Sequence, residues 1–202
     1  MQNILTNLRL TVISGFILAL LLYLIITPLL GGDLATDRAW WSFFFRWLHV
    51  ISGIMWIGLL WYLNFVQVPS MPNIPDDQKP AITKVIAPAV LWYFRWAAMA
   101  TLVTGIIVAI LNHYTLDGLG LGIFDSGAST PIGIGMWLGI IMWFNVWFVI
   151  WPNQKKALGI VEASADERAA AAKTALLFSR TNTMLSIPML FCMVAMQSGG
   201  FA

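Results

Sequence analysis

The sequence carries little charge, and this scarcity excludes most soluble folds. Only 10% of its 202 residues are charged, whereas a soluble domain averages about 25%. The net charge of +2 at pH 7 is too small to indicate binding to nucleic acid. Hydrophobic residues make up 59% of the chain, and its mean hydropathy is +0.81. The composition therefore predicts an integral membrane protein whose main partner is the lipid bilayer.

Cysteine and histidine are scarce as well. Cys192 is the one cysteine, so no intrachain disulfide can form and the sequence does not reveal the redox compartment. The motif C-x-x-C-H does not occur, which excludes a covalently attached c-type haem. His49 and His113 are the two histidines. We predict no metal centre of the kind that clusters of cysteine and histidine build.

Five apolar stretches are long enough to cross a bilayer, which takes about 20 helical residues. They predict a polytopic all-α protein, with five transmembrane helices in one domain covering residues 1–202. The first stretch is longer than the apolar region of a signal peptide and lacks a clear A-x-A site, which favours a retained helix. The predicted spans are Leu8–Leu30, Trp41–Val66, Ala89–Asn112, Ile132–Trp151 and Thr174–Gln197.

Prolines, glycines and capping residues mark the connections between these spans. Four prolines between positions 69 and 80 predict a polar connector after the second span. The glycine-rich stretch before Pro131 is typical of a flexible surface loop. Ser164 and Glu167 form the capping-box pattern S-x-x-E, so we expect a helix that runs on into the last span. Pro188 lies within that span and can kink it.

The basic residues predict the orientation, because lysine and arginine concentrate in cytoplasmic loops. With a cytoplasmic N-terminus, the outer side holds Arg38 and, at its edge, Arg46. This asymmetry favours an N-in, C-out topology, and we expect the bacterial inner membrane as the location. The basic residues of the inner side are Arg9, Lys79, Lys84, Lys155, Lys156, Arg168 and Lys173.

The second and fourth spans share an ungapped pattern. Residues 55–64 read MWIGLLWYLN and residues 136–145 read MWLGIIMWFN. The following spans carry Arg95 and Arg180, each with a methionine four residues later. The pattern predicts a duplicated helical hairpin, spans two and three matching spans four and five, with an axis along the membrane normal. Chance is the alternative, because tryptophan, glycine and leucine are common in membrane helices.

The repeat places two arginines and several amides near the cytoplasmic end of the bundle. Guanidinium offers a fork of donors that suits a planar anion, so these residues are candidates for substrate binding. The alternative is that the arginines reach the inner headgroups and the asparagines bond between helices. The candidates are Arg95, Arg180, Asn64, Asn145 and Asn182.

The two histidines are predicted to lie near the outer face at similar depth. His49 starts a descending helix and His113 ends an ascending one, so both imidazoles can ligate a haem b or a metal. The alternatives are an interhelical or interfacial hydrogen bond for His49 and an exposed loop position for His113. No carboxylate falls within the spans, so no catalytic residue is assigned.

Three segments resemble a known family. They are RWLHVISGIMWIGLLWYLNFVQVPSMP from Arg46, NVWFVIWPNQKK from Asn145 and SRTNTMLSIPMLFCM from Ser179. They resemble the membrane domain of PuuD-type urate hydroxylases, the urate oxidase N-terminal domain family. The resemblance implies a multi-helix membrane domain, often followed by a cytochrome c, that oxidises urate to 5-hydroxyisourate in purine breakdown. We expect a stand-alone form without the C-terminal cytochrome c. The positions within the resembling motifs are His49, Asn64, Asn145, Arg180, Thr181 and Asn182.

Two functions remain open at this point. The first is a membrane redox protein, in which an anionic purine binds at the arginine end or beside His49. Its electrons would leave through a haem or a separate cytochrome c on the outer side. The second is a non-catalytic accessory or assembly subunit of a larger respiratory or photosynthetic complex, whose haem or chlorin His49 would ligate. A small transporter fits less well, because no helix is clearly broken at the membrane midplane.

Overall fold

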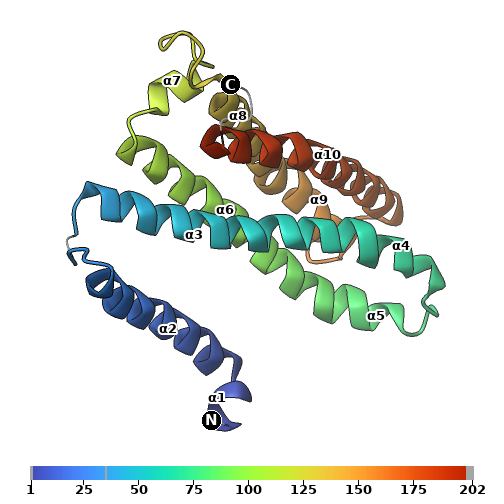
Figure 1. Cartoon of the computed structure of the whole chain (residues 1–202). Helices are drawn as coiled ribbons and strands as arrows, with labels where there is room; N and C mark the ends of the chain where they lie inside the picture. Colours follow the sequence, from blue (N-terminus) through green and yellow to red (C-terminus); the bar gives the residue numbers. More distant parts are fainter. Residues whose placement is uncertain (1, 35, 199–202) are drawn as a thin grey trace. The chain divides into compact units, whose positions relative to one another are not determined.

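The computed structural model describes residues 2–34 and 36–198, and within these ranges every regular element is a helix (Figure 1). The predicted all-α class is therefore confirmed. The chain divides into two compact units, residues 1–41 and residues 42–202. The single membrane domain expected for residues 1–202 stays a prediction.

The first unit is built around one long apolar helix, α2 (Leu8–Leu29), which follows the short helix α1 (Gln2–Leu5). Asn7 caps α2, because its side-chain oxygen accepts the backbone N–H groups of Arg9 and Leu10. None of the residues of α2 is buried, and most of them are aliphatic. Such a surface is stable where lipid rather than water surrounds the helix.

The second unit contains the remaining helices, although the first residues of α3 belong to the first unit. Three short segments are π-helical and one is a 3₁₀ turn. The elements are α3 (Arg38–Trp61), π-helical η1 (Tyr62–Gln67), α4 (Val68–Ser70), 3₁₀ η2 (Met71–Asn73), α5 (Lys79–Ala81), π-helical η3 (Ile82–Ile86), α6 (Ala87–Leu111), α7 (Thr115–Leu119), α8 (Thr130–Phe144), π-helical η4 (Asn145–Ile150), α9 (Trp151–Ala157) and α10 (Ala165–Ser198).

Four stretches of the described residues are long and apolar enough to cross a membrane, which supports an integral membrane protein. They are Leu8–Leu29, Arg38–Asn73, Lys79–Leu111 and Thr130–Ala157. The predicted fifth span, Thr174–Gln197, lies inside α10 and is not among them. The run of polar residues from Ser179 to Thr183 lowers the hydropathy of its centre.

Three spans extend beyond the prolines that were expected to bound them. The predicted ends at Val66 and Trp151 are wrong, since the helices continue through Pro69 and Pro152, and the third span already begins at Lys79. A π-helical segment closely precedes each of the two crossed prolines. Pairing of residue i with i+5 moves the carbonyls out of the α-helical register. It thereby relieves the clash between a proline ring and the carbonyl four residues earlier.

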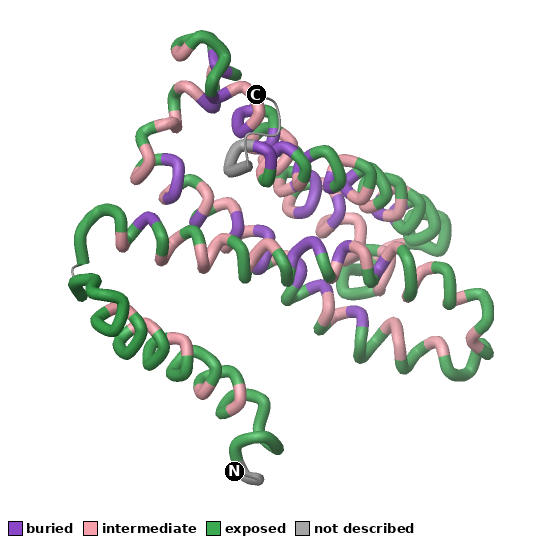
Figure 2. The backbone as a smooth tube through the Cα atoms, in the orientation of Figure 1, coloured by how far each residue is buried: buried purple, intermediate pink, exposed green. Residues whose placement is uncertain are grey.

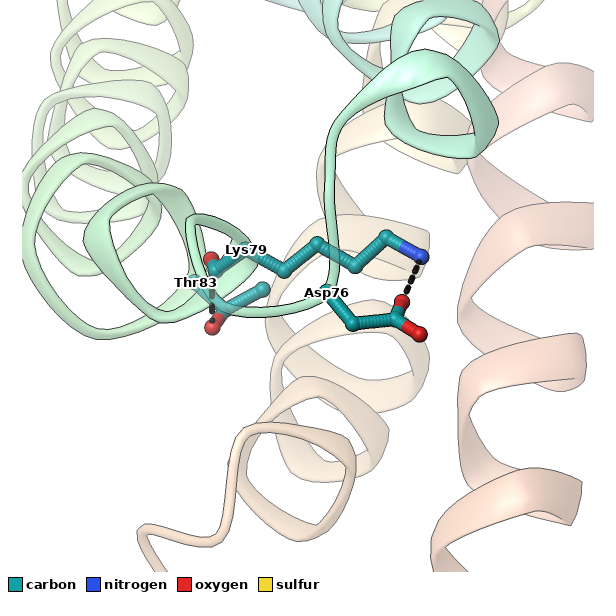
Figure 3. Close-up of polar contacts among 3 residues, drawn as sticks. All are labelled: Asp76, Lys79 and Thr83. Carbon is teal, nitrogen blue, oxygen red and sulfur yellow. Dashed lines mark hydrogen bonds and ion pairs between the residues drawn. The ribbon is translucent and has the colours of Figure 1, made fainter.

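The connector between η2 and α5 is a short turn with an ion pair at its surface. Lys79 Nζ lies 2.6 Å from Asp76 Oδ1, and Thr83 Oγ1 donates to the Lys79 carbonyl at 3.1 Å (Figure 3). The hydrogen bond and charge of Lys79 hold the pKa of the Asp76 carboxyl below its usual range. Pro80 occupies the first helical turn, where its missing N–H is not needed. The non-helical connector is therefore shorter than predicted, because Pro69, Pro72 and Pro80 lie in helical segments and residues 74–78 alone join η2 to α5.

The stretch between α6 and α8 contains a short helix that packs on α8. Trp137 Nε1 donates to the Leu119 carbonyl at 3.0 Å. A Cβ on Gly133 would overlap the Gly118 carbonyl oxygen, so only glycine fits at this crossing. The glycines expected to make a flexible loop therefore also serve close packing.

The start of α10 is the predicted capping box. The Ser164 N–H donates to Glu167 Oε2 at 2.8 Å, and the Glu167 N–H donates back to Ser164 Oγ at 3.3 Å. This reciprocal pair satisfies two backbone donors that no helical carbonyl can reach. From here α10 runs on into the last predicted span, as expected, and it continues past Pro188 to Ser198.

The core of the second unit lies where α3, α6, α8 with η4, and α10 face one another, and the buried residues gather there (Figure 2). Gly135 lets α8 approach α10 closely, because an added Cβ would lie 3.3 Å from Cys192 Cβ. Gly139 faces open space, so only the first glycine of the G-x-x-x-G pattern packs. The buried core residues are Trp56, Ile57, Leu60, Phe94, Ala97, Ala98, Met142, Val146, Ile150 and Met189.

Candidate functional site

A polar stripe runs along the buried face of α10. Ser179 lies three and four residues before Asn182 and Thr183, and Ser186 lies four and three residues after them, so the four side chains share one side of the helix. Asn182 and Ser186 are 0% exposed. Polar groups inside a membrane protein are expensive unless they are hydrogen-bonded. The hydrogen-bond partners of these four side chains therefore indicate the role of the stripe.

Asn145 and Asn182 bond to each other across the interior. Asn145 Nδ2 donates to Asn182 Oδ1 at 2.8 Å, and Asn182 Nδ2 donates to the Met142 carbonyl at 2.9 Å. The pair ties the junction of α8 and η4 to α10. Two of the predicted substrate-binding amides are thus engaged in an interhelical bond, the alternative that the sequence left open.

Asn64, in η1 directly after α3, hydrogen-bonds to the same stripe. Its Nδ2 donates to the Leu60 carbonyl at 2.9 Å and to Ser179 Oγ at 2.8 Å. Trp61 Nε1 donates to Ser186 Oγ at 3.0 Å. Asn64 Oδ1 and Gln67 Oε1 are buried acceptors with no hydrogen-bond partner in the described chain. These two oxygens therefore lack the donor that a buried acceptor usually has.

Arg95 lies against two tryptophans of the following hairpin. Its Cζ is 3.7 Å from the centroid of the Trp151 ring and 5.4 Å from that of Trp147. Its Nε and Nη1 are buried and have no acceptor among the described residues. Lys155 Nζ lies 5.8 Å from the Trp151 ring. The ring faces hold the guanidinium in place while two of its donors stay unpaired, and an unpaired buried guanidinium favours an anion as its partner.

Arg180 does not join Arg95. Its side chain is exposed, whereas Asn182, two residues later on α10, is fully buried. Two residues correspond to about 200° of helical rotation, so the buried face that holds Asn182 turns Arg180 outward. The predicted cluster of two arginines and three amides is therefore not assembled: Arg95 stacks on tryptophans, and the asparagines bond between helices.

His49 packs against α6 through one ring nitrogen. Its Nδ1 lies 2.9 Å from the Thr101 carbonyl oxygen and 3.3 Å from Thr104 Oγ1. A carbonyl only accepts, so Nδ1 carries the proton and the lone pair resides on Nε2. Gly105 provides the room, because a Cβ there would lie 2.9 Å from His49 Cε1. The ring is thereby fixed with Nε2 unprotonated.

His113 caps α6 and does not meet His49. It is exposed with φ +58°, its N–H donates to the Ile110 carbonyl, and the Tyr114 N–H donates to the Ala109 carbonyl. These bonds are a Schellman motif, with His113 at the left-handed position. Between Gly105 beside His49 and the end of α6 at Leu111, the helix rises about 9 Å. The structure therefore does not bring the two imidazoles to one iron.

A comparison with known families identifies the second hairpin. The family model described as urate oxidase N-terminal matches residues 121–199. Residues 121–199 are therefore similar to the urate oxidase N-terminal family. The resemblance predicted from the sequence is confirmed here, over α8, η4, α9 and α10. No curated protein and no solved structure matches the chain.

The segment that matches the family model contains the Asn145–Asn182 pair and the tryptophan and serine partners of Arg95, Trp61 and Asn64. Trp147, Trp151 and the stripe on α10 lie inside it, whereas His49 and Arg95 lie outside it. The sequence analysis did not predict that Arg95 stacks on Trp151. It also did not predict that Ser179 and Ser186 accept hydrogen bonds from Asn64 and Trp61. A signal for the serines was present, since polar residues recur on α10 at helical spacing within an apolar stretch.

Proposed function

We propose that the chain is a membrane redox protein of the urate hydroxylase membrane-domain type, which binds an anionic purine at Arg95 in the bacterial inner membrane. The observation that carries this proposal is the guanidinium lying 3.7 Å over Trp151 with Nε and Nη1 buried and unpaired. Trp151 lies in the segment that matches the urate oxidase N-terminal family model. Arg95 therefore contacts the segment that matches the family model.

The chemistry of urate fits these groups. The urate anion is planar, carries ring N–H donors and delocalises its charge over ring nitrogens and carbonyl oxygens. The Nε–H and Nη1–H groups of Arg95 can each donate a charge-assisted hydrogen bond to an acceptor of such an anion. Asn64 Oδ1 and Gln67 Oε1, on η1, are further buried acceptors without a hydrogen-bond partner among the described residues. Trp147 and Trp151 provide aromatic faces at the arginine.

The reaction consumes water and releases electrons. Urate plus water gives 5-hydroxyisourate, two protons and two electrons, as a new C–O bond forms at C5 of the purine. Arg95 stabilises the negative charge of the purine during this step. The four candidate spans carry no Asp or Glu, and in this balance the two protons would go to water. A haem or a separate cytochrome c on the outer side would supply the one-electron acceptor.

We include in this proposal the predicted duplication of the helical hairpin and the predicted five-span topology with a cytoplasmic N-terminus. Asn64 and Asn145, which end the two matching sequence segments, both lie in π-helical segments, η1 and η4. A π-helical turn is rare, so its recurrence after an aligned pattern supports a common origin. α10 packs along α8 and carries the stripe to which both asparagines bond, which supports its place as the fifth span.

The test is urate-dependent reduction of an added one-electron acceptor, cytochrome c, by membranes containing the protein. Arg95→Gln removes the charge and should lower kcat/KM for urate by about 10–100-fold, because a charge-assisted hydrogen bond contributes about 1.5–3 kcal/mol. Lys84→Gln removes an exposed cation of the same hairpin and should leave kcat/KM unchanged. No urate oxidation by the wild type, or an equal loss in Arg180→Gln, would overturn the proposal.

An accessory subunit is the competing function, and the same preparation tests it. A chain that co-purifies in fixed ratio with other membrane proteins, and leaves cytochrome c unreduced with urate, has that role. The exposed aromatic and aliphatic side chains of α3 and α6 offer surface for such contacts as well as for lipid. The Arg95 variants would then change complex formation rather than turnover.

A further inference from the structure

We propose that His49 is the axial ligand of one haem b, with Arg46 as the partner of a haem propionate. The role of this haem as electron acceptor rests on the proposed function, whereas its binding does not. His49 alone supplies the protein ligand, because His113 lies at the end of α6 and caps that helix. The argument rests on the state of the imidazole, the space around it and the charge beside it.

The imidazole is in the state that a haem iron needs. Nδ1–H donates to the Thr101 carbonyl at 2.9 Å, which leaves the lone pair on Nε2. Metal-bound histidines commonly donate their other ring N–H to a backbone carbonyl, which fixes the ring and raises its basicity. Within the described residues, no protein group bonds to Nε2. A histidine that served only to join α3 to α6 would need the Nδ1–H hydrogen bond but not an unpaired Nε2.

The surroundings admit a flat group next to the ring. His49 and Gly53 are four residues apart on α3, and so they share a helix face. A Cβ added to Gly53 would have Thr101 Cγ2 as its nearest neighbour, at 4.0 Å. Gly105 of α6 leaves space for the imidazole itself, since a Cβ there would be 2.9 Å from Cε1. Gly105 therefore accommodates the imidazole, and Gly53 adds no side chain to the space one turn further along α3.

A cation lies one turn from the ligand, toward the start of α3. Arg46 precedes His49 by three residues and is exposed. Its charge acts on Tyr114, whose pKa is raised by burial and lowered in part by Arg46. No acidic side chain is paired with Arg46 among the ion pairs of the described residues. A haem propionate at the end of the bundle gives this arginine its counter-charge.

The experiment is a reduced-minus-oxidised spectrum of the detergent-purified protein, together with the haem content per chain. Wild type should show a b-type spectrum. His49→Gln keeps a donor for the Thr101 carbonyl but removes the ligand, so bound haem should fall at least tenfold while the helix content stays the same. His113→Ala is the matched control and should keep its full haem content. Added imidazole should restore the spectrum of His49→Gly.

The outcomes separate this inference from the proposed function. A wild type without a b-type signal after haem supplementation, or a His49→Gln variant with full haem content, overturns the haem site. If urate still reduces cytochrome c in that case, the proposed function stands without it. A protein with His49-dependent haem and no urate oxidation retains the haem site and loses the proposed function. Arg46→Gln should lower haem content less than His49→Gln does.

Discussion

Asn145 donates a hydrogen bond of 2.8 Å to Asn182 in the interior of the second unit, and Asn182 passes it on to the Met142 carbonyl. The two asparagines lie on the two arms of one helical hairpin. This hairpin is within residues 121–199, the segment that matches the family model. Neither side chain has water as an alternative partner, since both are buried. The pair therefore determines the register of α10 against α8, and its loss has a definite cost.

Substitution of Asn182 by alanine should destabilise the protein by about 1–3 kcal/mol, because it leaves Asn145 Nδ2 and the Met142 carbonyl unpaired in the interior. Thermal unfolding in detergent measures the effect. Thr181→Ala, at an exposed neighbouring position, is the control and should change stability by less than about 0.5 kcal/mol. The Asn145→Ala, Asn182→Ala double variant should cost less than the sum of the single ones. Strict additivity would show that the pair is not coupled.

Gly105→Ala should disturb His49 directly. The new Cβ would lie 2.9 Å from His49 Cε1 and 3.1 Å from Nδ1, closer than real contacts allow. The ring must shift and weaken its bond to Thr101, at a cost of about 1–3 kcal/mol. Gly58→Ala is the matched control on α3, because its Cβ meets nothing within 4 Å and alanine favours helix. Equal stabilities of the two variants would contradict the packing of His49 on Gly105.

His113→Gly should stabilise the protein by about 0.5–1 kcal/mol. His113 has φ +58° at the left-handed position of the Schellman motif, where a side chain is strained and glycine is favoured. Thermal unfolding of the variant beside wild type gives the difference. A clear loss of stability would mean that the imidazole makes a contact worth more than the backbone strain.

Trp151→Leu should weaken urate binding without removing the charge of Arg95. The guanidinium lies 3.7 Å from the ring and loses its fixed position with the ring. A cation–π contact contributes about 0.5–2 kcal/mol, so the KM for urate should rise about 3–30-fold. Trp151→Phe retains an aromatic face and should stay near the wild-type KM. A KM that is equal in all three proteins would place the purine elsewhere.

Lowering the pH should loosen the start of α10. Hydrogen bonds from the Ser164 backbone N–H and hydroxyl hold the pKa of the Glu167 carboxyl below its usual value. A lowered pKa means that this contribution to stability is present above the unfolded pKa of about 4.3 and is lost as the pH falls through the folded pKa. Hydrogen exchange at the first turn of α10 should therefore speed up in acid. In Glu167→Gln, that acceleration should be absent.

Local features of the chain were readable before any tertiary structure. The capping box of Ser164 and Glu167 depends on residues three apart, and it forms as the pattern predicted. The apolar stretches likewise predicted helices, because length and hydropathy decide whether a segment crosses a membrane. The ends of two of them were missed, since a π-helical turn carries the helix past Pro69 and Pro152 and no local pattern announced it.

Sequence alone therefore determined an all-helical membrane protein and its family resemblance, since these follow from composition, periodicity and long shared segments. Only the tertiary structure decided which polar residues meet. Arg95 and Arg180 are equivalent in the repeat, yet Arg95 stacks on Trp151 while Arg180 faces outward. The reason is physical: helical spacing orders residues around an axis, but the packing of other helices decides which face is buried and what it touches.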